Sequence, residues 1–226
     1  MIDNQSFKEL YQSLDKDQNK MFNSIIENKM TCCDAKAGTG KTTIAVMAAF
    51  KLLEIDVVNK IIYIRFPDKM VQSLGAFPGE LVDKEKYYMQ PFFDACKELD
   101  ISEDLLYKQY IPTEQIQLMT NITLRGSNFK DSAVIIDEAQ NATFKDLKLV
   151  LTRLHDSCHS VLIGHVAQCD NKNADKEEAF TMYIDHLCKK PWSKKIVLKN
   201  NYRGEVSKWA DSLVLTPNGY IVDRYQ

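Results

Sequence analysis

The sequence predicts an α/β fold in which a mostly parallel central sheet carries helices on both faces. Helical and strand-like segments alternate along most of the 226 residues, as expected when helices connect parallel strands. Two expected strands, 133–137 (AVIID) and 160–164 (SVLIG), are almost wholly apolar, which is typical of strands buried on both faces. No segment rich in Pro, Gly or Ser divides the chain, so residues 1–226 are expected to form a single domain.

The individual elements follow from hydrophobic periodicity and from turn residues such as Pro112. The helical N-terminal segment, about 1–28, contains a break near residues 14–17. Helices are expected at 7–28 (as two helices), 42–54, 83–98, 102–109, 143–154, 177–189 and 205–215. Strands are expected at 29–33, 60–65, 116–120, 133–137, 160–164 and 195–199. Sheets of this kind bind ligands at the carboxyl ends of their strands, so the residues after each strand are the candidates for a site.

The composition is that of an ordinary globular chain, and it excludes several classes. Hydrophobic residues make up 45% of the chain, and no apolar run approaches the roughly 18 residues that span a bilayer. The polar first residues lack the pattern of a signal peptide, so we expect a cytoplasmic protein. The six cysteines show no CxxC spacing and are expected to be free thiols. The net charge of −2 restricts any nucleic-acid partner to a local basic patch.

A phosphate-binding loop is the most specific motif in the chain. The segment 35–42 (AKAGTGKT) follows an expected strand, opens an expected helix and fits the pattern [AG]-x-x-x-x-G-K-[ST]. Its glycines allow backbone N–H groups to point at phosphate oxygens, and the N-terminus of the helix adds partial positive charge. Lys41 would reach the β- and γ-phosphates of ATP, and the Thr42 hydroxyl would ligate Mg²⁺. The residues expected to bind nucleotide here are Ala37, Gly38, Thr39, Gly40, Lys41, Thr42 and Thr43. The alternative is a glycine-rich turn that binds nothing.

An acidic pair ends the apolar strand at 133–137. Asp137 would hold Mg²⁺ opposite Thr42, and Glu138 would orient and deprotonate the attacking water. The alternative is a solvated acidic turn, which the neighbouring phosphate loop makes the weaker interpretation. A kinase must keep its ATP from water, so a glutamate that can activate water favours hydrolysis over phosphoryl transfer to another acceptor.

Further segments extend the pattern over roughly residues 14–210. They are RFP at 65–67, LGAFPGE at 74–80, RGSNFKDSAVIIDEAQNAT at 125–143, LTR at 151–153 and GHVAQCD at 164–170. With these segments the chain resembles the PhoH-like ATPases, RecA-like relatives of the superfamily 1 helicases. The resemblance implies a three-layer RecA-like P-loop NTPase that uses ATP and Mg²⁺. The compact form would suit a bacteriophage-encoded member acting in the host cytoplasm.

The same resemblance implies roles for residues outside the two main motifs. Gln18 would read the edge of the adenine ring, and Gln140 and Gln168 would sense the γ-phosphate. Tyr202 would stack on adenine, and Arg203 would neutralise charge on the γ-phosphate. A solvated surface position is the alternative for Gln18, Gln140, Gln168 and Arg203.

A nucleic-acid surface is the least specific of these implications. Arg65, Phe66 and Arg125 would face single-stranded nucleic acid, because a basic group can bind phosphate while an aromatic ring stacks on a base. RNA is favoured over DNA, although no motif here reads a 2′-hydroxyl. Phe66 follows a buried strand, so it could equally be a core residue.

Two positions depart from the pattern of the family. Ala35 replaces the usual first glycine of the loop, which is a mild change. His165 stands where members usually carry Asp, and an imidazole cannot supply that negative charge. We therefore expect weak or pH-sensitive stimulation by nucleic acid, and a harmless neutral substitution is the alternative.

Three functions remain open on the sequence alone. The leading interpretation is an ATPase coupled to single-stranded nucleic acid, as a helicase or remodeller. The second is a nucleotide-dependent binding or assembly module with slow, uncoupled hydrolysis, and the third is a P-loop kinase, against which Glu138 argues. Superfamily 1 motors clamp ATP between two RecA-like domains and this chain has room for one. The resemblance therefore implies a homo-oligomer, with a hexameric ring as the hypothesis.

Overall fold

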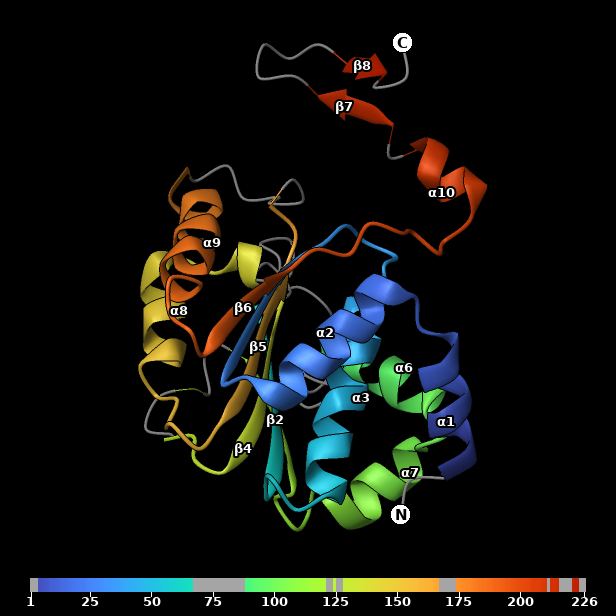
Figure 1. Cartoon of the computed structure of the whole chain (residues 1–226), viewed down its shortest axis with the longest axis vertical. Helices are drawn as coiled ribbons and strands as arrows, with labels where there is room; N and C mark the ends of the chain where they lie inside the picture. The colour runs from blue at the N-terminus through green and yellow to red at the C-terminus, as the bar shows by residue number, and fades with distance from the viewer. Residues whose placement is uncertain are drawn as a thin grey trace, which may run out of the picture.

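The computed structural model describes residues 4–66, 88–120, 124, 128–166, 174–210, 212–215 and 221–223. In these ranges the chain forms a six-stranded, wholly parallel sheet and a two-stranded antiparallel ribbon. Figure 1 shows helices α2, α3 and α6 on one side of the sheet and helices α8 and α9 on the other. The α/β class with helices on both faces of a parallel sheet is therefore confirmed.

The strand order brings the two nucleotide motifs together. The sheet runs β3-β2-β4-β5-β1-β6, so only β5 separates the strand before the phosphate loop from the strand that ends in the acidic pair. Because all these strands are parallel, their carboxyl ends meet at one edge of the sheet. The strands are β1 (Met30–Asp34), β2 (Lys60–Arg65), β3 (Ile116–Thr120), β4 (Ser132–Asp137), β5 (His159–Gly164) and β6 (Ser193–Ile196).

The helices follow the expected pattern, including the early break. Asp15 caps the second helix by accepting hydrogen bonds from the backbone N–H groups of Asp17 and Gln18 (both 2.8 Å), which starts a new helix where the sequence predicted one. The helices are α1 (Asn4–Ser13), α2 (Lys16–Glu27), α3 (Lys41–Glu54), α6 (Gln90–Glu98), α7 (Glu103–Leu105), α8 (Phe144–Leu151), α9 (Ala174–Leu187) and α10 (Glu205–Ala210). Helix α7 continues as a π-helix, η2 (Leu106–Tyr110), and a 3-10 turn, η3 (Ala139–Asn141), follows β4.

Several expected elements are wrong in their bounds. The helix expected at 143–154 ends at Leu151, and the helix expected at 177–189 runs from Ala174 to Leu187. The strand expected at 195–199 is β6, which begins at Ser193 because residues 30–33 of β1 pair with residues 193–196. The helix expected at 205–215 ends at Ala210, and Leu213–Leu215 is instead strand β7, paired with β8 (Ile221–Asp223). The run Leu-Val-Leu has the apolar, branched character of a strand, which overrides a helical continuation. In Figure 1 this ribbon stands away from the main body.

The core consists of two apolar layers, one on each face of the sheet. Consecutive residues of β4 point to opposite faces, so Ile135 packs with Phe50 and Phe92 under α3 and α6. Its neighbour Ile136 packs with Phe180 under α9. These two layers bury both faces of the sheet and thereby hold the strand ends in place.

Two further expectations concern cysteines and membranes. Five cysteines of the described residues are free thiols, and Cys169 lies outside those residues. Among the helices that the structure describes, none is long and apolar enough to cross a membrane.

Replacing Ile135 by alanine tests this burial of the sheet. Ile135 is 1% exposed, so the substitution leaves a cavity and should lower the free energy of unfolding by about 2–5 kcal/mol. Ile55 is 44% exposed, and Ile55→Ala should change the free energy of unfolding by no more than about 0.5 kcal/mol. Chemical denaturation of both variants measures the difference, and equal losses would contradict this assignment of the core.

Candidate functional site

A cavity of about 710 Å³ opens at the carboxyl edge of the sheet. Its volume lies within the range of about 300–1,000 Å³ usual for small-molecule sites. Its walls come from α1, α2, the phosphate loop, α3, β2, α6, the end of β4 and the segment after β6. Residues singled out from the sequence that line it are Gln18, Ala37, Gly38, Gly40, Lys41, Thr42, Thr43, Arg65, Asp137, Glu138, Tyr202 and Arg203.

The phosphate loop has the backbone that its glycines allow. Gly38 and Gly40 adopt φ angles of 76° and 77°, in the left-handed region that L side chains rarely enter. Thr39 donates its hydroxyl to the carbonyl of Lys36 at 3.0 Å, which closes the loop on itself. The Lys41 ammonium lies 3.5 Å from the same carbonyl, so it is held inside the loop. A ring of backbone N–H groups around one ammonium can bind a phosphate chain.

Asp137 and Thr42 meet at the floor of the cavity. The Thr42 hydroxyl donates to Asp137 Oδ2 at 3.2 Å, although 95 residues separate the two in sequence. Tyr63 donates to the same oxygen at 2.6 Å, and burial, followed by the charge of Asp137, raises the pKa of Tyr63 well above its ordinary value. A hydroxyl and a carboxylate are hard oxygen ligands, so this pair fits the ion Mg²⁺.

Glu138 is held in an unusual conformation at the end of β4. Its φ angle of 52° places it in the left-handed region, which is uncommon for a residue with a side chain and is frequent at functional sites. Gln140 donates its amide to Glu138 Oε2 at 2.5 Å. Gln140 Oε1 in turn accepts the backbone N–H of His165 at 3.1 Å. A side chain at Gly164 would meet this Gln140 oxygen at 2.5 Å, so the position needs glycine.

Asp34 is a residue that the sequence analysis missed. Its Oδ1 atom lies 3.1 Å from His165 Nδ1 and accepts the backbone N–H of Val166 at 3.2 Å. The hydrogen bond to His165 is the largest cause that lowers the pKa of Asp34. A carboxylate therefore stands beside the His165 imidazole, at the position where the resemblance implies an aspartate. The available signal was a charged residue directly after a buried strand.

These contacts join into one hydrogen-bonded path across three strands. It runs from Asp34 at the end of β1, through His165 after β5, to Gln140 and then to Glu138 after β4. The strand next to the phosphate loop is thereby linked to the carboxylate expected to act on water.

Gln18 and Tyr202 frame the outer end of the cavity. Gln18 Oε1 accepts the backbone N–H of Asp15 at 3.0 Å, and its amide donates to the Thr39 carbonyl at 3.1 Å. Both ends of its carboxamide thus bind backbone, and it ties α2 to the phosphate loop. The Tyr202 hydroxyl donates to Asp15 Oδ2 at 2.6 Å. Asp15 is the second residue that the sequence analysis missed, because its partner Tyr202 lies 187 residues away.

Arg203 lies directly over the phosphate loop. The backbone N–H of Tyr202 donates to the Gly38 carbonyl at 2.7 Å. A Cβ atom on Gly38 would lie 2.5 Å from Arg203 Cγ and 2.6 Å from Asn201 Oδ1. The side chain of Arg203 therefore lies beside the loop that would hold the phosphates, and one chain supplies both.

The residues expected to face nucleic acid are arranged differently. Arg65 lines the same cavity and donates to the Tyr88 carbonyl at 3.0 Å. Phe66 is 2% exposed and packs in the core, which is the alternative that the sequence left open. Arg125 and Gln168 lie outside the described residues.

The parallel sheet and the phosphate loop at its carboxyl edge define the class of P-loop nucleotide-binding proteins. A large terminase of bacteriophage HK97, solved by crystallography, shares this fold with a TM-score of 0.53 at 12% identity, over 94% of this chain and 47% of that one.

Within that class, the chain belongs to the PhoH-like protein family, whose family model matches residues 12–210. A PhoH-like protein of Bacillus subtilis (strain 168) is 36% identical over 59% of this chain and 41% of its own length. A PhoH-like protein of Synechocystis is 31% identical over 70% of this chain and 48% of its own. Protein PhoH of Escherichia coli K12 is 30% identical over 65% of this chain and 42% of its own. The chain thus spans less than half the length of these relatives.

Gly38→Ala tests the contact between the loop and Arg203. The added methyl would clash with Arg203 and Asn201 at a strained φ, so the affinity for ATP with Mg²⁺ should fall about tenfold or more. Gly204→Ala is the matched control, because its φ is +93° and nothing lies within 4 Å of its Cβ position. Titration with a fluorescent ATP analogue measures both, and equal losses would show that strain alone is responsible.

Asp34→Asn tests the Asp34–His165 pair through pH. The pKa of Asp34 is lowered in the folded chain, so ionised Asp34 adds to the free energy of unfolding at pH values above its ordinary pKa of 3.8. This contribution is lost as the pH falls through the lowered pKa. Wild type should therefore lose more free energy of unfolding than Asp34→Asn between about pH 5 and about pH 3. Urea denaturation at the two pH values measures this, and parallel losses would contradict a lowered pKa.

Proposed function

We propose that this chain is an ATPase that uses Mg²⁺ and couples ATP hydrolysis to single-stranded nucleic acid, RNA in preference to DNA, as a helicase or remodeller. The observation that carries the proposal is the convergence of Lys41, Thr42, Asp137, Glu138 and Arg203 on one cavity of about 710 Å³. Each supplies a chemical group that phosphoryl transfer to water needs.

Phosphate binding falls to the loop and to two cations. The backbone N–H groups of the loop and the Lys41 ammonium would hold the β- and γ-phosphates. Arg203, beside Gly38, would neutralise charge that develops on the γ-phosphate as it leaves ADP. When bound between Thr42 and Asp137, Mg²⁺ would supply further neutralisation of phosphate charge.

The hydrolytic step would depend on Glu138. Its carboxylate would accept a proton from water as the water oxygen bonds to the γ-phosphorus and the bond to the bridging oxygen of ADP breaks. Gln140, now bound to Glu138 at 2.5 Å, would hold the carboxylate in place until the γ-phosphate competes for the amide. The hydrogen bonds from Gln140 to His165 and from His165 to Asp34 would then change with the bound nucleotide, and so transmit its state to the ends of β5 and β1.

A second candidate function rests on that same path. His165 replaces the family's acid and is already paired with Asp34 at 3.1 Å, so the coupling to nucleic acid could be lost while hydrolysis remains. The chain would then be a nucleotide-dependent binding or assembly module with slow, uncoupled hydrolysis. In either function we propose a homo-oligomer, with a hexameric ring as its form, because the exposed Tyr202 and Arg203 leave the cavity open to a neighbouring subunit.

Steady-state ATP hydrolysis by the purified chain tests the proposal. Wild type should hydrolyse ATP, and single-stranded RNA should accelerate it more than single-stranded DNA. Glu138→Gln should keep ATP affinity but lose about 10²-fold or more in kcat, because the proton acceptor is gone. Lys41→Ala is the blank, since it removes a phosphate ligand.

Each outcome selects between the two functions. Hydrolysis that depends on Lys41 and Glu138 but ignores both strands would favour the uncoupled module. An unchanged kcat in Glu138→Gln would refute the assignment of the general base.

A further inference from the structure

The structure has a second pocket, at the edge of the sheet opposite the nucleotide cavity. We infer that this pocket and the basic turn beside it form a binding site for single-stranded nucleic acid. One unpaired base would stack on Trp192 in the pocket, and the flanking phosphates would bind Lys189, Lys190 and Lys194. This inference rests on the proposed function, because it names the place where the single strand coupled to ATP hydrolysis would bind.

The position of this pocket follows from the strand register. Met30 is the first residue of β1, and it pairs with Ser160 near the start of β5 and with Ser193 at the start of β6. The pocket is lined from these amino ends and from the end of α9. The phosphate loop follows the other end of β1, so about 16 Å of strand separates the two sites.

The pocket has the size and chemistry for a single ring. Its volume of about 120 Å³ is well below the range of about 300–1,000 Å³ usual for small-molecule sites, so it admits a base but not a whole nucleotide. Trp192 lines it and is 39% exposed, so its indole face is available for stacking. Leu154 and Leu187 give it apolar walls.

A polar group inside the pocket has no partner. Ser160 lines the pocket and is 1% exposed, and no described protein group bonds to its hydroxyl. Buried hydroxyls are normally hydrogen-bonded, since leaving one unpaired costs free energy. The edge of a base carries both donors and acceptors and can supply the missing bond.

The turn that carries Trp192 is strongly basic. Residues 189–195 (KKPWSKK) hold four lysines and no acid. Lys195 pairs with Asp185 at 3.4 Å, and Lys29 at the pocket rim pairs with Asp156 at 3.3 Å. Within the part of the chain that the structure describes, Lys189, Lys190 and Lys194 are exposed and have no ion-pair partner. Three lysines without an ion-pair partner among the described residues therefore lie within three positions of one exposed ring.

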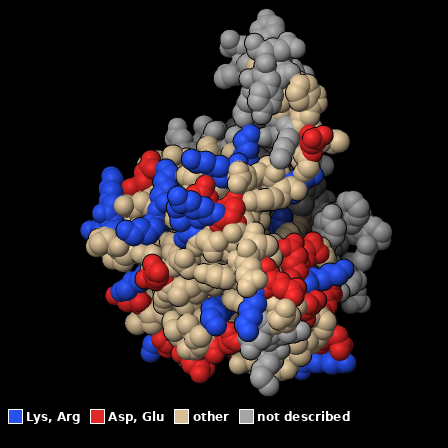
Figure 2. Space-filling view, turned by 45° about the vertical axis from the view of Figure 1, so that its right-hand side comes forward, with Lys and Arg blue, Asp and Glu red and all other residues tan. Residues whose placement is uncertain are grey.

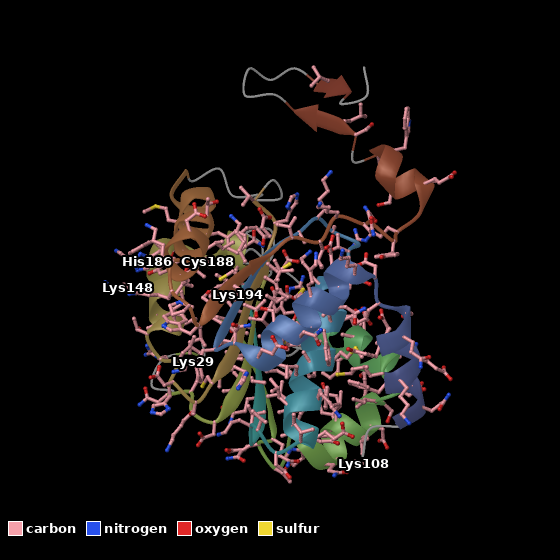
Figure 3. The ribbon with its side chains drawn as sticks, in the orientation of Figure 1. Lys29, Lys108, Lys148, His186, Cys188 and Lys194 are labelled. Atoms are coloured by element: carbon pink, nitrogen blue, oxygen red, sulfur yellow. The ribbon has the colours of Figure 1, made fainter. Side chains whose placement is uncertain are left out.

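The figures show the surroundings of this turn. In Figure 3, Lys194, Cys188 and Lys29 lie on the side of the molecule formed by α8, α9 and β6, far from Lys108 below α7. In Figure 2, Lys and Arg side chains are densest at the upper left of the view, with Asp and Glu among them. The chain as a whole has a net charge of −2, so the four lysines of residues 189–195 are a local excess of positive charge.

The turn is also rigid, which favours binding without a large loss of entropy. The Ser193 N–H donates to the Lys190 carbonyl at 3.1 Å, and Pro191 fixes the backbone between them. The Met30 N–H donates to the Trp192 carbonyl at 3.2 Å, which ties the turn to β1. The backbone that carries the ring and the lysines is thereby held in place beside the pocket.

Protection of a sheet edge explains only part of this arrangement. β6 is an edge strand, and lysines on edge strands prevent pairing with other chains. That accounts for Lys194 and Lys195. It does not account for Lys189 and Lys190, which precede the strand, or for an exposed tryptophan above a pocket with an unpaired hydroxyl. Basic groups interleaved with an aromatic ring are the combination that binds single strands.

Tryptophan fluorescence gives a direct test, because the chain has two tryptophans. In a Trp209→Phe background, the emission of Trp192 should be quenched by a short single-stranded oligonucleotide. Trp192→Leu should weaken binding about 5- to 150-fold, and Ser160→Ala about three- to tenfold. Basal ATP hydrolysis should stay unchanged in both, since neither residue lies at the nucleotide cavity.

Salt dependence tests the lysines separately. Replacing Lys189, Lys190 and Lys194 by serine removes three phosphate contacts, so the slope of log affinity against log salt should shrink by about 2. Lys8 in α1, Lys97 in α6 and Lys108 in η2 are exposed on elements that lie on the other side of the sheet (Figure 1), and the same three substitutions there are the control. Equal effects of the two triple variants would overturn the inference.

Three further outcomes would overturn it as well. If polyglutamate quenches Trp192 as an oligonucleotide does, the turn binds acidic polymers by charge alone. If AMP alone quenches it as strongly, the pocket is a mononucleotide site. If Trp192 does not respond but a strand still accelerates ATP hydrolysis, the strand binds elsewhere and the proposed function survives. If Trp192 responds but no strand affects hydrolysis, the site stands and the coupling fails.

Discussion

The site depends first on one buried carboxylate, Asp137. It is 1% exposed, and burial of an unpaired charge is costly, so the fold surrounds it with donors. Tyr63 and Thr42 both donate to Oδ2, and the Glu138 N–H donates to Oδ1 at 2.9 Å. These bonds tie β2, the start of α3 and the turn after β4 to a single point. The carboxylate that would ligate Mg²⁺ therefore also holds the carboxyl edge of the sheet together. A bound Mg²⁺ would compete with Tyr63 and Thr42 for Oδ2 of Asp137.

The sequence was sufficient for those parts of the site that are local. The phosphate loop and the acidic pair are contiguous motifs, and each follows a strand that its own apolar run predicts. It was insufficient for contacts whose partners are distant. Asp34 meets His165 across 131 residues, and Asp15 meets Tyr202 across 187, so no periodicity relates them. The bounds of β6 and of the C-terminal helix failed for a similar reason, because pairing with β1 and with β8 decided them.

The two pockets lie at opposite edges of the sheet, one proposed to bind nucleotide and the other a single strand. β1 spans both, since Met30 lies beside the Trp192 turn and Asp34 lies beside the phosphate loop. A parallel strand is stiff along its length, and here it is buried between two apolar layers. A small shift of β1 would therefore be felt at both edges.

The contact of Tyr202 with Gly38 has a consequence for the end of the chain. The segment after β6 is fastened to the loop at this point, and α10 and the ribbon β7–β8 follow within a few residues. Figure 1 shows that the ribbon stands away from the main body. A displacement of the loop would therefore reach residues 202–204 first, and these residues lead directly into α10.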